Sequence, residues 1–215
     1  MSIALHETPI RVLLDYAGVG VFAASGALAA ARRRFDIVTF AFFAAVTGIG
    51  GGTLRDLLIG APVFWVHDAG YMAMCIAAAG IVWAVGGRGW RFDVLLWLDA
   101  IGIGAYSVLG TAKAATWGAP PLIAIVMGVL SATFGGIVRD VLAGEPSALH
   151  RKEIYVTAAV AGGTSFVALR LLGFGEVPAG VLAAGFAFCI RAGGLQLGWT
   201  LPGFAGQVGE DDKRS

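Results

Sequence analysis

Seven stretches of predominantly apolar residues divide this chain of 215 residues, and only short connections separate them. A helix that crosses the hydrocarbon core of a bilayer needs roughly 20 such residues, because each residue advances the helix by about 1.5 Å. The stretches are residues 11–31, 36–58, 68–87, 93–115, 119–142, 154–172 and 178–198. The sequence therefore predicts an all-α integral membrane protein with seven transmembrane helices.

Composition excludes the main alternatives to a membrane protein. Hydrophobic residues make up 58% of the chain and charged residues only 13%, with a mean hydropathy of +0.81. A soluble domain carries about 25% charged residues, because it must cover its surface with them. A soluble globular enzyme, a disordered chain and a nucleic-acid-binding protein are therefore excluded. We expect no enzymatic activity, no cofactor and no metal site.

The basic residues predict which side of the membrane each connection occupies. Alternating connections place four Lys and Arg residues on one side and eleven on the other. The smaller set is Arg11, Arg55, Lys113 and Arg170, and the larger set is Arg32, Arg33, Arg34, Arg88, Arg91, Arg139, Arg151, Lys152, Arg191, Lys213 and Arg214. Because basic residues are retained in the cytoplasm, we expect the N-terminus outside and the C-terminus in the cytoplasm. The membrane expected is the inner (plasma) membrane of a bacterium.

The first six stretches form an internal repeat with a constant offset of 84 residues. Residues 51–62 align with residues 135–146 without a gap. The same offset pairs Asp15 with Asp99, Gly18 with Gly102, Gly20 with Gly104, Gly26 with Gly110, Thr47 with Ser131, and Tyr71 with Tyr155. Each repeat holds three spans, an odd number, so the two repeats (about 11–87 and 93–172) must be inverted relative to each other. The helix at 178–198 is an addition to them; residues 1–203 form one domain, followed by a polar tail at 204–215.

Small and hydroxylated residues gather near the middle of the second and fifth stretches. They are Thr47, Gly48, Gly50, Gly51, Gly52 and Thr53 in the second, and Ser131, Thr133, Gly135 and Gly136 in the fifth. Glycine costs about 1 kcal/mol relative to alanine inside a helix, so we expect both helices to loosen or kink there. Freed carbonyls and nearby hydroxyls could then replace part of a cation's hydration shell. The alternative is close helix packing through small residues.

Charged residues inside the spans are candidates for a functional site. We expect two equivalent clusters, formed by Asp15, Arg55 and Asp56 near the outer side and by Asp99, Arg139 and Asp140 near the inner side. Each cluster is either a structural brace or the place where an arginine acts as an electrostatic gate in a pathway. Lys113 and Arg191 are expected to extend toward the membrane surface, with Lys113 also a possible pore charge.

The motifs Gly-Gly-Gly-Thr-Leu-Arg-Asp (50–56) and Phe-Gly-Gly-Ile-Val-Arg-Asp (134–140), set in two three-helix repeats plus a seventh helix, resemble the prokaryotic branch of the trimeric intracellular cation (TRIC) channel family. The same domain is also labelled a glycine transporter domain. The resemblance covers residues 9–200 or so. It implies a homotrimer with one potassium-permeable pore per protomer, and helices kinked at Gly50–Gly52 and Gly135–Gly136. The lipid-binding Lys-Glu-Val motif of animal members is missing from residues 111–114.

These observations predict a passive monovalent-cation channel, with a potassium-permeable pore between the second and fifth helices of each protomer. The alternative is a carrier for a small zwitterion such as glycine. Half-helices that begin after Gly52 and Gly136 would direct positive dipole ends at a carboxylate, which suits such a substrate. A scaffold without transport would explain neither the paired glycine runs nor the buried charges.

Overall fold

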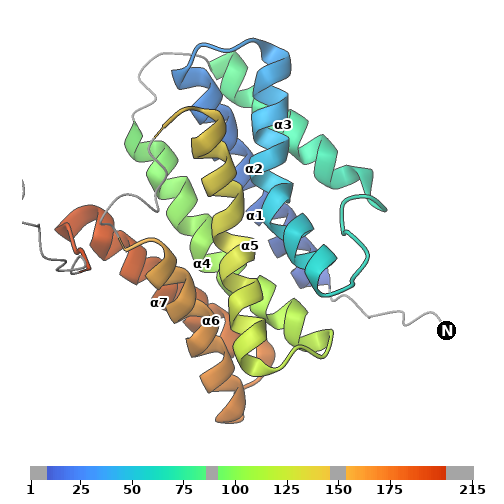
Figure 1. The fold of residues 1–215 in the computed structure, drawn as a ribbon, viewed down its shortest axis with the longest axis vertical. Coiled ribbons are helices and arrows are strands. Elements are labelled where there is room, and N and C mark those ends of the chain that lie inside the picture. The colour runs from blue at the N-terminus through green and yellow to red at the C-terminus, as the bar shows by residue number, and fades with distance from the viewer. Residues whose placement is uncertain (1–8, 86–91, 146–153, 202–215) are drawn as a thin grey trace, which may run out of the picture.

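The computed structural model describes residues 9–85, 92–145 and 154–201 as a bundle of seven α-helices (Figure 1). They are α1 (Pro9–Arg32), α2 (Ile37–Leu58), α3 (Ala69–Val85), α4 (Phe92–Thr116), α5 (Pro121–Leu142), α6 (Val156–Leu171) and α7 (Glu176–Leu197). Consecutive helices run in opposite directions. We call the end of the bundle where α1 begins and α2 ends the first end, and the opposite end the second end. The predicted polar tail at 204–215 lies outside the described residues.

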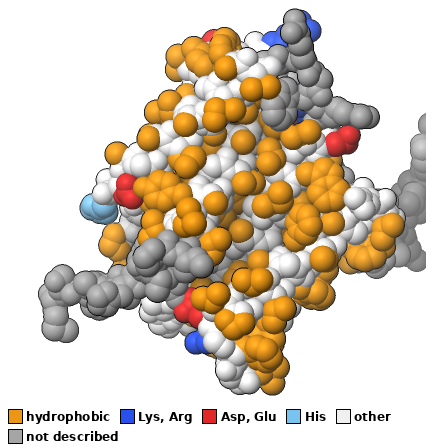
Figure 2. Space-filling model, turned by 180° about the vertical axis from the view of Figure 1, so that it is seen from behind, with side chains coloured by type: hydrophobic (Ala, Val, Ile, Leu, Met, Phe, Trp, Pro, Cys, Tyr) orange, Lys and Arg blue, Asp and Glu red, His pale blue; other side chains and the backbone are white. Residues whose placement is uncertain are grey.

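The helices have the length and surface of membrane-embedded elements. Five of the described helices (α1, α2, α4, α5 and α7) are long and apolar enough to cross a bilayer. The other two, α3 with 17 residues and α6 with 16, are apolar but shorter. Hydrophobic side chains are spread over the whole face shown in Figure 2, which carries few charged groups. The all-helical membrane fold predicted from the sequence is confirmed.

The two predicted repeats are visible as helix pairs. Adding 84 to the bounds of α2 reproduces those of α5, and α1 and α3 correspond in the same way to α4 and α6 within a few residues. Contacts between the copies are reciprocal: a Cβ on Gly18 would meet the Tyr106 ring, and a Cβ on Gly102 would meet the Phe22 ring. Such exchange of equivalent positions is what a two-fold relation between the copies produces. Helix α7 has no counterpart.

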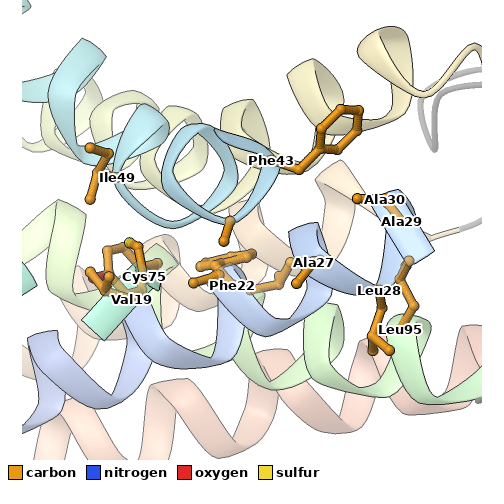
Figure 3. Packing of buried hydrophobic residues seen from close by; sticks show 14 of the residues in the cluster. Val19, Phe22, Ala27, Leu28, Ala29, Ala30, Phe43, Ile49, Cys75 and Leu95 are labelled. Carbon is orange, nitrogen blue, oxygen red and sulfur yellow. The ribbon is translucent and has the colours of Figure 1, made fainter. Parts of the chain in front are cut away.

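The main core cluster joins α1, α2 and α3 with α4, α5 and α6, and one part of it lies where α1, α2 and α3 pack together. Val19, Phe22 and Cys75 are buried there, with Ile49 on the facing helix (Figure 3). Both α2 and α5 end in the same way, because Gly60 and Gly144, 84 residues apart, each adopt a left-handed backbone conformation that favours glycine. The equivalent ends of α2 and α5 therefore present the charged residues just before them in equivalent settings.

Candidate functional site: a glycine crossing between two buried charge clusters

Helices α2 and α5 cross at their glycine runs, and the crossing is symmetric. A Cβ on Gly51 would collide with the backbone carbonyl of Ser131, and a Cβ on Gly135 would collide with that of Thr47. The two contacts are equivalent. Gly51 corresponds to Gly135 in the other repeat, and Thr47 corresponds to Ser131. Only glycine lets two backbones approach this closely. The two runs therefore face each other, as the repeat predicts.

The helical backbone continues through both runs, so α2 and α5 are not interrupted there, and the expected loosening or kink at the glycines stays a prediction. All residues of α2 (Ile37–Leu58) and α5 (Pro121–Leu142) are α-helical. The bilayer offers no water to hydrogen-bond a freed carbonyl, so breaking the helix would cost free energy. Close packing of the neighbouring helix against the glycines stabilises the unbroken helix further. The half-helix N-termini that would attract a carboxylate are accordingly not present after Gly52 and Gly136.

Three of the other glycines in the two runs each pack against a different neighbour. A Cβ on Gly48 would lie 3.1 Å from the Cys75 sulfur, and one on Gly52 would lie 2.7 Å from the Phe64 ring. A Cβ on Gly136 would meet the Tyr155 hydroxyl. Gly50 differs from its neighbours, because nothing lies within 4 Å of a Cβ built there.

Hydroxyl groups surround the crossing. Ser131 donates to the Met127 carbonyl at 2.8 Å, Thr133 to the Val129 carbonyl at 2.8 Å, and Thr53 to the Ile49 carbonyl at 2.7 Å. Each of these bonds stays within one helix and leaves the hydroxyl oxygen able to accept, as the Thr53 oxygen does from the Trp65 indole N–H at 2.9 Å. Thr47 is buried, and its hydroxyl finds no hydrogen-bond partner among the described residues. The crossing thus contains polar oxygen at the centre of an apolar bundle.

The first cluster centres on Asp56, which is fully buried near the first end. Its Oδ1 accepts from Arg55 Nε at 2.8 Å, and its Oδ2 accepts from Lys113 Nζ at 2.9 Å and from the Phe64 amide at 3.2 Å. Lys113 therefore turns inward to Asp56 rather than extending to the membrane surface. A carboxylate buried at this depth requires such partners, because desolvation of an unpaired charge is costly.

A cavity of about 350 Å³ lies beside this cluster. Asp15, Arg55 and Lys113 line it together with Glu176 at the start of α7, and apolar side chains of α4 and α7 form most of its wall. Asp15 and Arg55 thus line the same cavity. The cavity brings charged groups of both signs from four helices to the first end.

The second cluster centres on Arg139, which is almost completely buried near the second end. Its Nη1 lies 3.0 Å from Asp99 Oδ1 and donates to the Ser25 hydroxyl at 3.0 Å. Its Nη2 lies 2.8 Å from Asp140 Oδ1. The structure therefore brings Asp99, Arg139 and Asp140 together, and adds Ser25 from α1. Two carboxylates face one guanidinium here, whereas Asp56 in the first cluster faces two cations.

Helix α7 supports the second cluster through Arg191. The expectation that Arg191 extends to the membrane surface is wrong, because it is fully buried. Its guanidinium lies 5.3 Å from the centre of the Tyr155 ring and donates to the Ile154 carbonyl at 3.4 Å. The Tyr155 hydroxyl donates in turn to the Thr133 carbonyl at 3.5 Å, a long contact. The offset had paired Tyr155 with Tyr71, but no pattern pointed to its contact with Arg191.

The arrangement has a simple order along α2 and α5. Arg55 lies one turn beyond Gly51 toward the first end, and Arg139 lies one turn beyond Gly135 toward the second. The glycine crossing is therefore flanked by a buried ion-pair cluster on either side. No group of three or more His, Cys, Asp or Glu side chains suited to a metal ion occurs within residues 9–85, 92–145 and 154–201.

Comparison with known proteins finds the same repeat. A family model described as "Glycine transporter" matches residues 12–86 and again residues 96–170, which are 84 residues apart. A UPF0126 membrane protein of Vibrio cholerae is 36% identical over 202 residues, covering 93% of this chain and 84% of that protein. The UPF0126 inner membrane protein YadS of Escherichia coli is 42% identical over 153 residues, covering 70% and 74%.

A solved structure supports the same assignment. The TRIC trimeric intracellular cation channel orthologue of Rhodobacter sphaeroides is similar with a TM-score of 0.86 and 44% identity, over 89% of this chain and 100% of that chain. The chain belongs to the TRIC cation channel family, with the glycine transporter domain as its repeating unit.

Proposed function

We propose that this protein is a passive channel for monovalent cations, permeable to potassium, with one pore in each protomer between α2 and α5. The observation that carries the proposal is the symmetric glycine crossing, set between two buried charge clusters in a fold shared with a TRIC channel. A buried polar seam of this kind is costly in a bilayer and is expected where ions pass. We further propose a homotrimer, because the similar Rhodobacter protein is described as trimeric.

The proposed pathway uses the polar groups in order. A cation enters from the cavity lined by Asp15 and Arg55, passes the hydroxyls of Thr47 and Ser131 at the crossing, and leaves past the second cluster. Hydroxyl and carbonyl oxygens can replace part of the hydration shell of potassium. Asp99 and Asp140 offer carboxylate oxygens beside Arg139 that can attract a cation at that end.

The crossing is closed to a hydrated ion in this conformation, because backbone packs against backbone there. Opening requires α2 and α5 to separate around Gly51 and Gly135. We propose that Arg139 contributes an electrostatic barrier whose position depends on its bonds to Asp99, Asp140 and Ser25.

Recording from purified protein in planar bilayers under asymmetric KCl tests the proposal. Unitary currents whose reversal potential follows the potassium gradient support a channel. Saturable glycine counterflow without unitary currents would instead support a carrier, the activity that the family model's description suggests. If reconstituted protein of confirmed assembly shows neither unitary currents nor glycine counterflow, transport through this crossing is refuted.

Arg139→Gln gives a sharper test of the pathway. Removal of the charge should change the unitary conductance while assembly, measured by size-exclusion chromatography with light scattering, stays intact. Arg33→Gln is a matched control, because Arg33 is a surface residue that donates to the Gly144 carbonyl at the same end. A change in folding yield alone would leave Arg139 as a structural brace only.

A further inference from the structure

The connection between α2 and α3, residues 59–68, turns back onto the first cluster. Its central residue, Phe64, places its ring against Gly52, with 2.7 Å between the ring and a Cβ built on that glycine. The ring centre lies 5.6 Å from Lys113 Nζ, and the Phe64 amide donates to Asp56. One loop residue therefore contacts the carboxylate, the cation and the helix backbone of the first cluster.

Two further contacts hold the connection in this position. Trp65 donates its indole N–H to the Thr53 hydroxyl at 2.9 Å. The Phe64 ring packs edge-on against Tyr71, with ring centres 4.7 Å apart, and Tyr71 stacks on Tyr16 at 4.2 Å. The Tyr16 hydroxyl donates to Asp68 at 2.7 Å, at the end of the same connection. Aromatic pairs of this kind contribute beyond the area that they bury.

Among the described residues, the second repeat shows no equivalent ring at its glycine. At Gly136, the equivalent of Gly52, the space is taken by the hydroxyl of Tyr155. The residue 84 positions after Phe64 is Ala148, which has no ring to insert. The surroundings of the two clusters therefore differ in kind, with an apolar ring from a loop at the first end and polar Tyr155, Ser25 and Asp99 groups at the second.

We propose that the connection between α2 and α3 is an aromatic plug, in which Phe64 seals the first end of the pathway from water and must leave Gly52 before ions pass. The inference depends on the proposed channel function for its consequence, but the seal itself is testable without any current. Phe64 donates its amide to Asp56, which is fully buried although it lies close to the end of its helix. A phenyl ring held by a few contacts can move without unfolding either helix.

Cys75 provides a built-in reporter of the seal. It is fully buried, and it packs against Gly48, one turn deeper on α2 than Gly52. In a Cys189→Ser background, which removes the exposed thiol, Phe64→Ala should raise the rate of Cys75 modification by a charged methanethiosulfonate reagent about tenfold, equivalent to about 1.4 kcal/mol of opening free energy. Val66→Ala is the control, because Val66 is an exposed apolar residue of the same connection.

Trp65→Phe keeps an aromatic ring but deletes the hydrogen bond to Thr53, so it should raise the rate of Cys75 modification by a smaller factor. This variant keeps the test possible if the Phe64→Ala protein does not fold. In bilayer recordings, Phe64→Ala should increase open probability. Equal modification rates in Phe64→Ala, Trp65→Phe and Val66→Ala proteins would overturn the plug. Faster modification with no current from any variant, wild type included, would retain the plug and reject the channel.

Discussion

Gly50 and Gly51 are neighbours in the sequence with opposite surroundings. Gly51 lies against the backbone of α5, whereas a side chain at Gly50 would meet open space. Helix periodicity explains the contrast, because adjacent residues point about 100° apart and only one of them can face a given neighbour. The glycine run therefore contains positions under very different constraints, and substitutions can separate them.

Gly51→Ala should destabilise the protein, because its methyl group would collide with the Ser131 carbonyl and force α2 and α5 apart. Gly50→Ala should be neutral or stabilise by up to about 1 kcal/mol, the difference in helix propensity. Thermal unfolding in detergent measures both. If the crossing is the gate, Gly51→Ala should also raise open probability, and equal behaviour of the two variants would contradict the close approach.

Asp99 and Glu145 both pair with arginines at the second end, but they differ in burial. Asp99→Asn should cost roughly 3–5 kcal/mol, because it leaves Arg139 buried with less compensation. Glu145→Gln should cost at most about 1 kcal/mol, since its bonds to Arg32 and Arg33 lie at the surface. Chemical denaturation in mixed micelles compares them. Similar losses would show that burial does not set the cost.

At the scale of the helix, most boundaries were predictable from composition. The stretch 36–58 became α2 (Ile37–Leu58), and 119–142 became α5 (Pro121–Leu142). Apolar length and the flanking polar residues determine such ends, and both are local in sequence.

The interiors of the same helices were less predictable. Helix propensity predicts that the helix is least stable at Gly50–Gly52. Tertiary packing stabilises the helix there, and this packing involves residues about 80 positions away in the sequence. The bond from Arg139 to Ser25 joins residues 114 apart, and that from Lys113 to Asp56 joins residues 57 apart. The sequence did not indicate the contacts of Phe64, because no motif or spacing distinguishes an aromatic residue in a connection that packs on a helix from one that does not.

The start of α2 gives a prediction about pH. Asp36 caps the helix by accepting from the Thr39 amide at 2.9 Å, and this hydrogen bond lowers the pKa of Asp36 in the folded protein. A lowered folded pKa means that the stabilisation is complete above the unfolded value of about 3.9 and is lost as pH falls through the folded value.

Asp36→Asn keeps the acceptor oxygen but removes the charge. The stability of wild type relative to Asp36→Asn should therefore decrease as pH falls from about 5 toward 3. Thermal melting followed by circular dichroism across this range measures the difference. A constant difference at every pH would contradict a charge-dependent cap.

At the scale of the whole molecule, an odd number of crossings would separate the chain ends. The distribution of Lys and Arg, eleven against four, favours the C-terminus in the cytoplasm. A green fluorescent protein fused after Ser215 should fluoresce in a bacterial host, whereas alkaline phosphatase fused there should be inactive. The reverse pattern would invert the orientation, and with it the side on which the Phe64 plug lies.

The reciprocal contacts between the repeats constrain how such a molecule could have arisen. A polypeptide with only α1, α2 and α3 would expose Gly18 and Gly51, whose shapes accommodate a ring and a carbonyl that the same polypeptide carries at Phe22 and Thr47. These surfaces could all be packed only against a second copy inserted in the opposite orientation. A single-repeat ancestor with this seam would thus have been a dual-topology dimer, later fused into one gene product.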